Sequence, residues 1–110
     1  MTATATLTAS PPVADPNAPG FYDGRLDYGV VGLAPSQTVT IELAVPGLAL
    51  FVDVRTADAL GTISTYATTV YSAAWAGETH TWTLSVWGNK KGVVGRGPLL
   101  ATATAEVTVP

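Results

Sequence analysis

The sequence predicts an all-β domain, a sandwich of two antiparallel sheets with about seven strands. Composition is the first observation: Thr and Ala each occur 17 times and Val 13 times, and β-branched side chains fit a pleated sheet better than a helix. Several segments also alternate apolar and polar residues with a period of two, the pattern of half-buried strands. Finally, 11 Gly and 8 Pro are spread along the chain between these segments, where they mark turns.

A single domain accounts for the whole length. The chain has 110 residues, and two domains of half that size would each be too small to bury a core. Hydrophobic residues make up 47% and charged residues 12% of the sequence, the opposite of a disordered chain. We therefore expect residues 1–110 to form one sandwich, with a small closed barrel as the alternative.

The first 20 residues allow two interpretations. Residues 2–9 alternate Thr with Ala or Leu, and residues 10–20 contain four prolines, which make a semi-rigid spacer. The apolar face of 2–9 carries only small residues and one Leu, so we expect residues 1–20 to act as an N-terminal arm that serves assembly more than folding. The alternative is an ordinary first strand that closes its own sandwich.

The remaining strands are separated by recognisable turns. We expect strands over residues 22–32, 38–43, 48–54, 62–72, 79–87 and 99–109, and turns or loops over 34–36, 46–47, 58–61, 74–78 and 88–98. In the turn over 58–61, the side chain of Asp58 is expected to bond backbone amides. The run over 48–54 is more continuously apolar, so we expect it to be covered on both faces or to lie in an interface.

The alternation also predicts the core. Trp82 lies in the middle of a strand, in phase with Leu84 and Val86, and is expected to anchor the sandwich. The predicted core consists of the apolar residues on the inward parity of each strand: Leu7, Leu26, Tyr28, Val30, Val39, Ile41, Leu43, Ile63, Trp82, Leu84, Val86, Val107 and Val109.

Four segments together resemble bacterial immunoglobulin-like modules. Residues 33–41, LAPSQTVTI, resemble the turn and strand FxPGxxVTV of these modules, and residues 56–64, TADALGTIS, resemble their hairpin TxDxxGxFS. Residues 76–84, AGETHTWTL, resemble the entry AGxYTVTV to the penultimate strand, and residues 101–109, ATATAEVTV, resemble the last strand. The resemblance implies an immunoglobulin-like sandwich. One departure is His80, near the position where many relatives carry a tyrosine that fixes the sheet corner.

The resemblance implies one of two settings. Immunoglobulin-like modules form arrays in secreted bacterial surface proteins, and they decorate the heads and tails of tailed bacteriophages. Here a single module begins with Met1 and shows no basic, continuously apolar secretion signal, which favours the phage setting. The implied protein is a non-enzymatic subunit of the virion, made in the host cytoplasm, that decorates or stabilises the capsid or tail. Its partners would be the major capsid or tail protein and further copies of itself in a symmetric assembly.

The alternative function is a glycan-binding or adhesive module of a bacterial surface. In that case Trp75, in a loop, and Trp87, on the strand face opposite Trp82, would serve as stacking platforms for a host surface glycan. Trp and Tyr are also enriched in protein interfaces, so the same side chains suit either function.

The residue inventory argues against catalysis, cofactors and metals. The chain has no Cys and one His, so thiolate chemistry is excluded and acid–base chemistry would depend on His80 alone. The aspartates lack the dense spacing of a calcium loop, and we expect neither an enzyme nor a bound cofactor or metal. A net charge of −3 argues against nucleic-acid binding, and no apolar run reaches 18 residues, so we expect no membrane contact.

Candidate partner contacts follow from exposure and chemistry. The basic residues of the glycine-rich loop 88–98 would form an electrostatic contact with an acidic surface, or simply solvate a hairpin tip. The polar face of the first strand, the apolar run 48–54 and two tryptophans complete the set: Thr4, Thr6, Phe51, Trp75, Trp87, Lys90, Lys91 and Arg96.

Overall fold

The computed structural model of the chain describes residues 2–47, 49–88 and 97–110. These residues form strands β1 (Thr4–Ala9), β2 (Val13–Ala14), β3 (Phe21–Val31), β4 (Thr38–Val45), β5 (Ala49–Thr56), β6 (Ile63–Ser72), β7 (Thr79–Gly88) and β8 (Leu99–Thr108), with one 3₁₀ turn, η1 (Ala73–Trp75). The predicted all-β class is confirmed. Each of the seven predicted strands is present, with its ends within two residues of the expected ones, the usual uncertainty of element boundaries.

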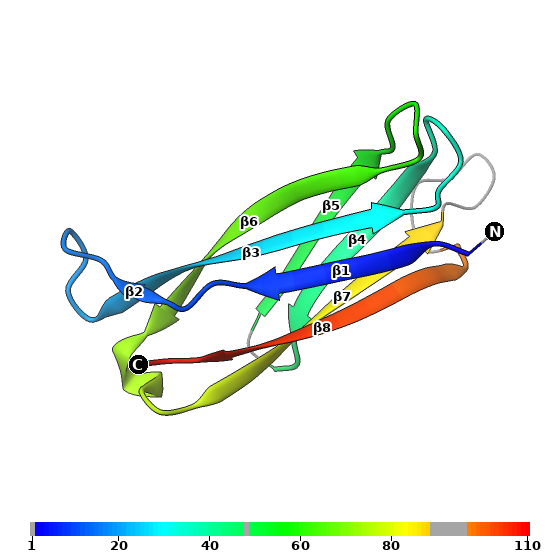
Figure 1. The fold of residues 1–110 in the computed structure, drawn as a ribbon. Coiled ribbons are helices and arrows are strands. Elements are labelled where there is room, and N and C mark those ends of the chain that lie inside the picture. The colour runs from blue at the N-terminus through cyan, green and yellow to red at the C-terminus, as the bar shows by residue number, and fades with distance from the viewer. Residues whose placement is uncertain (1, 48, 89–96) are drawn as a thin grey trace.

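The strands form two antiparallel sheets that pack as layers (Figure 1). In the first sheet β3 is central: it pairs with β6 on one side and with β1 and β2 on the other. The second sheet has the order β5-β4-β7-β8. β1 and β8 lie side by side at one edge of the sandwich (Figure 1), and β5 and β6 form the opposite edges of the two sheets. The predicted sandwich of two antiparallel sheets is therefore confirmed.

The proline-rich segment contains one strand that the sequence analysis does not predict. Val13 and Ala14 pair with Asp23 and Tyr22 of β3. Residues 10–20 were expected to form a semi-rigid spacer because of their four prolines, which oppose a regular ladder, but Val13 and Ala14 both keep their backbone N–H groups, which a ladder requires. The pairing stops after two residues, and the chain then turns through Asp15–Ala18, where Ala18 N donates to Asp15 O.

The core matches the predicted set closely. Twelve of the thirteen predicted core side chains are buried, and Leu7 is half-buried against the same cluster. Trp82 is 6% exposed, and its indole Nε1 donates to the hydroxyl of Tyr71 at 2.9 Å. The core also includes four apolar residues outside the predicted set, all of them near strand ends or in connections: Leu33, Val45, Ala57 and Tyr71. The prediction that Trp82 lies in the core is confirmed.

The first strand belongs to its own sandwich. β1 pairs with β3 from Thr4↔Val31 to Ala9↔Leu26, and its small apolar residues and Leu7 pack against the core. Residues 4–9 therefore do not extend away from the domain as an arm, and the alternative of an ordinary first strand describes their placement. The reason is that β3 would otherwise present an unpaired edge along its length.

Deletion of residues 2–9 is consequently expected to destabilise the isolated domain, by at least about 3 kcal/mol, because it uncovers part of the core and one edge of β3. Chemical denaturation of the parent and the truncated chain measures this loss. A truncated chain with the parental free energy of unfolding would show that β1 serves assembly alone.

The turn over residues 58–61 is built as predicted. Asp58 Oδ1 accepts hydrogen bonds from the backbone N–H groups of Leu60 and Thr62, both at 2.9 Å. Gly61 has a φ of 75°, and its carbonyl oxygen accepts a hydrogen bond from the backbone N–H of Leu33 at 3.1 Å. This turn therefore ties the β5–β6 connection to the segment that follows β3.

Candidate protein-interaction site

The edge strand β5 departs most from the expected burial. The run 48–54 was expected to be covered on both faces or to lie in an interface. Within this chain β5 is not covered: Leu50, Phe51, Val52 and Val54 are all exposed. The first half of that expectation is wrong because, among the described strands, β5 pairs only with β4, so it has one neighbour and no layer over its outer face. The second half, an interface, stays a prediction.

One side of β5 presents three aliphatic side chains to solvent. Leu50, Val52 and Val54 are 66%, 52% and 46% exposed. They stand opposite Ala44, Glu42 and Thr40 of β4, whose neighbours on β7 are Thr83, Ser85 and Trp87. Partners in register lie on the same face of a sheet. Leu50, Val52, Val54 and Trp87 therefore share the outer face of the second sheet, and we call these four residues the apolar face.

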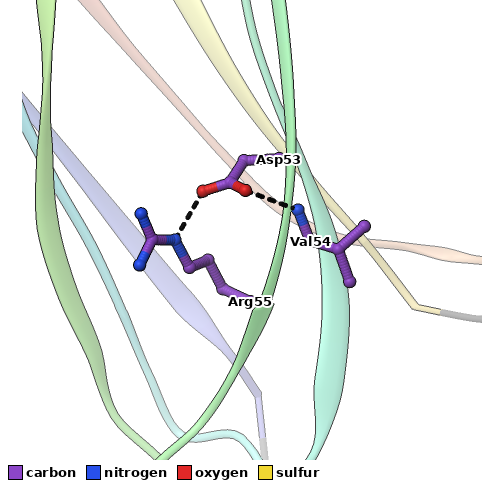
Figure 2. A network of polar contacts seen from close by, with 3 residues as sticks. All are labelled: Asp53, Val54 and Arg55. Atoms are coloured by element: carbon purple, nitrogen blue, oxygen red, sulfur yellow. Dashed lines mark hydrogen bonds and ion pairs between the residues drawn. The ribbon is translucent and has the colours of Figure 1, made fainter.

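The other side of β5 carries the charges. Asp53 and Arg55 stand opposite Ile41 and Val39, which are fully buried core residues, so both charged side chains are on the inner side of the strand. Figure 2 shows the Asp53 carboxylate between two donors, the backbone N–H of Val54 at 2.9 Å and the Arg55 guanidinium, with which it forms an ion pair.

These charges also influence their neighbours. The hydrogen bond to Asp53 and the negative charge of Asp53 raise the pKa of Arg55. Burial raises the pKa of Tyr28 on β3; the charge of Asp53 raises it further, and Arg55 lowers it. Charged side chains that point inward on an edge strand discourage a further strand from pairing there. The inner side of β5 therefore carries charges that oppose pairing with a further strand, and its outer side is apolar.

The predicted contact residues fall in different parts of the fold. Thr4 and Thr6 are exposed on β1, and Phe51 is 41% exposed on the inner side of β5, where it borders a groove with Tyr66 of β6. Trp87 is half-buried and belongs to the apolar face. Lys90, Lys91 and Arg96 lie outside the described residues.

The two proposed stacking tryptophans are far apart. The ring of Trp75, in η1, lies 5.3 Å from the ring of His80 at the start of β7, and Trp87 lies seven residues further along the same strand. At a strand rise of about 3.4 Å per residue, roughly 24 Å separate His80 from Trp87. Trp75 and Trp87 therefore do not form one platform.

Leu50, Val52 and Val54 were not named singly among the predicted contacts, although they belong to the run 48–54 that was expected to be covered or to lie in an interface, and a further signal for them exists. Asp53 and Arg55 share one parity of the strand, and the three aliphatic residues share the other. This alternation indicates a strand with one polar and one apolar face. It does not indicate which face points outward, because that depends on the pairing with β4.

Neither a metal site nor a membrane-spanning helix is found in the described parts of the chain. No group of three His, Cys, Asp or Glu residues is arranged to hold an ion there, and no helix there is long and apolar enough to cross a membrane. In comparisons with known proteins, no family model, no curated protein and no solved structure matches the sequence or the fold. The class that the fold and site define is thus a two-sheet β-sandwich with an exposed apolar face on its edge strand.

Proposed function

We propose that this chain is a non-enzymatic structural protein of a bacteriophage virion, an immunoglobulin-like subunit that decorates or stabilises the capsid or tail. Its partners are the major capsid or tail protein and neighbouring copies in a symmetric assembly. The immunoglobulin-like assignment is supported by the sequence resemblance over residues 33–109, which phage and bacterial-surface modules share; the choice of the phage setting is an expectation from the sequence. The observation that carries the protein-binding function is the apolar face, with Val52 and its neighbours about half exposed or more.

The composition of this face suits contact with another protein. Contiguous apolar patches of more than a few hundred Å² on a soluble protein usually mark interaction sites, and the buried centre of an interface is depleted of charge and enriched in aromatic residues. Leu50, Val52 and Val54 form an uninterrupted aliphatic row along β5, and Trp87 adds an aromatic side chain two strands away, beyond Thr40 of β4. Glu42, opposite Val52, is the one charged residue among the register partners of this row. A partner that covered this row would remove all three aliphatic side chains from water.

The chemistry of β5 also supports a particular mode of docking. The Val54 N–H already donates to the Asp53 carboxylate, and the inward Asp53–Arg55 ion pair opposes the addition of a strand to this edge. Contact through side chains of the outer face needs neither group to move. We therefore expect a face-to-face contact instead of extension of the sheet.

The alternative, a glycan-binding or adhesive module, is less well supported. It would use Trp75 and Trp87 as stacking platforms, but these side chains lie near opposite ends of β7, and both are half-buried. The two tryptophans therefore cannot stack on one sugar together.

Val52→Lys is expected to abolish incorporation of the chain into phage particles while leaving the fold intact. Lysine at this position is solvated in the free monomer and faces Glu42 across the ladder. In an apolar contact its ammonium group would be buried with that one carboxylate, and the cost of desolvating both charges can exceed their attraction. We expect the free energy of unfolding to change by no more than about 0.5 kcal/mol. Immunoblots of gradient-purified particles, from a phage that carries the variant gene, measure incorporation.

Val31→Lys provides the matched control, because Val31 is 50% exposed on β3 of the other sheet, against 52% for Val52. This variant should incorporate like the parent. Normal incorporation of the Val52 variant would disprove docking through the apolar face, and absence of the parent chain from purified particles would disprove the virion assignment.

A further inference from the structure

The outer edge of β6 is a free sheet edge among the described strands. β6 pairs with β3 along its length, from Val30↔Ile63 to Phe21↔Ser72, without a bulge, and no other described strand pairs with it. An unpaired edge of this kind is a template for another strand unless charges, prolines or bulges protect it. The sequence of β6 contains no charged residue, no Pro and no Gly. This edge is therefore open to a further strand.

The other long edges of the two sheets are protected. β1 and β8 lie side by side at the opposite edge of the sandwich (Figure 1), so each screens the other. β5 carries the inward Asp53–Arg55 ion pair, and the backbone N–H of Val54 already donates to the Asp53 carboxylate. Within the described part of the chain, β6 is thus the long edge strand without such protection.

The ladder with β3 identifies the backbone groups of β6 that point to the free edge. In an antiparallel sheet, alternate residues of a strand direct their N–H and C=O groups to the same neighbour. Ala73 N donates to Gly20 O at 2.8 Å, one step beyond the pair Phe21↔Ser72, so the odd-numbered residues of β6 bond to β3. The even-numbered residues therefore direct their backbone groups to the free edge: Ser64, Tyr66, Thr68, Val70 and Ser72.

The register of a second strand determines which side chains would meet. Tyr66 and Val70 are 53% and 61% exposed on the outer face of β6. In a two-fold antiparallel pair of β6 strands centred on Thr68, Tyr66 of each copy stands opposite Val70 of the other, an aromatic–β-branched pair that stabilises a sheet. A two-fold axis at Ala67 would instead place Tyr66 opposite Thr68. The axis at Thr68 covers both large side chains and brings no charged residue opposite another.

A groove beside this edge leaves room for the inward side chains of a second strand. It has a volume of about 490 Å³, lies between β5 and β6, and is lined by Phe51, Arg55 and residues 65–68. The inward residues that flank the two-fold axis in this register, Ala67 and Thr69 of the second copy, are small. Arg55 stays paired with Asp53, so the contact covers no isolated charge.

We propose that two copies of this chain pair through β6, edge to edge and antiparallel, with the two-fold axis at Thr68. The first sheets of both copies then form one continuous sheet, joined by about ten backbone hydrogen bonds. A second copy is the occupant because it supplies an uncharged strand whose own edge is free, and a two-fold contact uses the same surface on both subunits. This interface lies apart from the apolar face and does not depend on the proposed function.

Analytical ultracentrifugation of the full chain tests the proposal, and we expect a reversible dimer. Thr68→Pro removes an N–H that points to solvent in the monomer, a position where an edge strand tolerates Pro. The dimer loses a hydrogen bond on each side of the axis, so its Kd should rise at least about tenfold. Thr68→Val keeps the N–H and should dimerise like the parent. Val52→Lys should also dimerise like the parent, which separates this proposal from docking through the apolar face.

Thr68→Cys tests the register, because the chain has no other Cys. The two Cα atoms at the axis would lie about 5.5 Å apart, within the span of a disulfide, so mild oxidation should link most of the dimer. Ser64→Cys, at an exposed position of the same strand, places its two sulfurs roughly 27 Å apart and should not form this link. Circular dichroism confirms that each variant is folded.

Three results would overturn the proposal: a parent chain that stays monomeric up to about 1 mM, a folded Thr68→Pro variant that dimerises like the parent, or equal cross-linking of the two Cys variants. If Thr68→Pro does not fold, the comparison of the two Cys variants still decides the question.

Discussion

Trp82→Ala is expected to lower the free energy of unfolding by about 3–5 kcal/mol, the usual cost of removing a large aromatic side chain from a core. Trp82 is 6% exposed in the middle of β7, and its Nε1 donates to the hydroxyl of the buried Tyr71. The substitution opens a cavity and leaves that hydroxyl without its donor, and both effects destabilise the folded state. The loss is a large fraction of the total stability of a small domain.

Denaturant titration followed by circular dichroism measures the effect, since the tryptophan itself is removed. Trp82→Phe should cost less, because the ring still fills most of the space and only the N–H is lost. Thr81→Ala, on the exposed face of the same strand, is the control and should change stability by no more than about 0.5 kcal/mol. If Trp82→Ala unfolds at the parental denaturant concentration, the packing of β7 against the first sheet is not as described.

Gly61→Ala is the second substitution with a large expected effect, a loss of about 2–5 kcal/mol. Gly61 has a φ of 75°, in the left-handed region, and a Cβ placed there would lie 2.0 Å from the carbonyl oxygen of Leu33. The obstacle is backbone, which cannot rotate away as a side chain can. The turn would have to separate from the β3–β4 connection and give up the bond from Leu33 N to Gly61 O.

Gly77→Ala separates the two parts of this cost. Gly77 has a φ of 83°, but a Cβ there meets nothing within 4 Å, so this variant has only the backbone strain of about 1 kcal/mol. Thermal and chemical unfolding of both variants should show Gly61→Ala to be clearly the less stable. Equal losses would mean that the close approach of Leu33 to the turn contributes nothing.

The strands were predictable from local pattern, and so was most of the core. Val39, Ile41 and Leu43 alternate with polar residues, and such an alternation has only one way to place its apolar side inward. Leu33 and Ala57 were missed because they lie in connections, where no period exists, and they are buried only when the β3–β4 and β5–β6 connections come together through bonds such as Ala57 N to Gln37 O.

The candidate sites were less predictable. Phe51 was proposed as part of the apolar run 48–54 and Trp87 from its strand parity, and Trp87 does lie on the apolar face. Leu50, Val52 and Val54 belong to the same run but were not named singly. Trp75 was expected as a loop aromatic available to a ligand, and the structure instead packs it against His80. The free edge of β6 follows from its single described neighbour, β3, which no spacing along the sequence determines.

Local patterns in the sequence predict that this protein is built from strands, the ends of seven of them to within two residues, and which parity of most strands is apolar, since backbone sterics and period-two alternation act locally. The folded structure alone fixes what each strand is next to. It made β5 an edge strand, so its aliphatic parity faces solvent and its charged parity faces the other sheet, and it placed β1 beside β3 within the same domain. The physical reason is that exposure depends on neighbouring layers, and pairing between residues distant in the chain leaves little trace in the local alternation of the sequence.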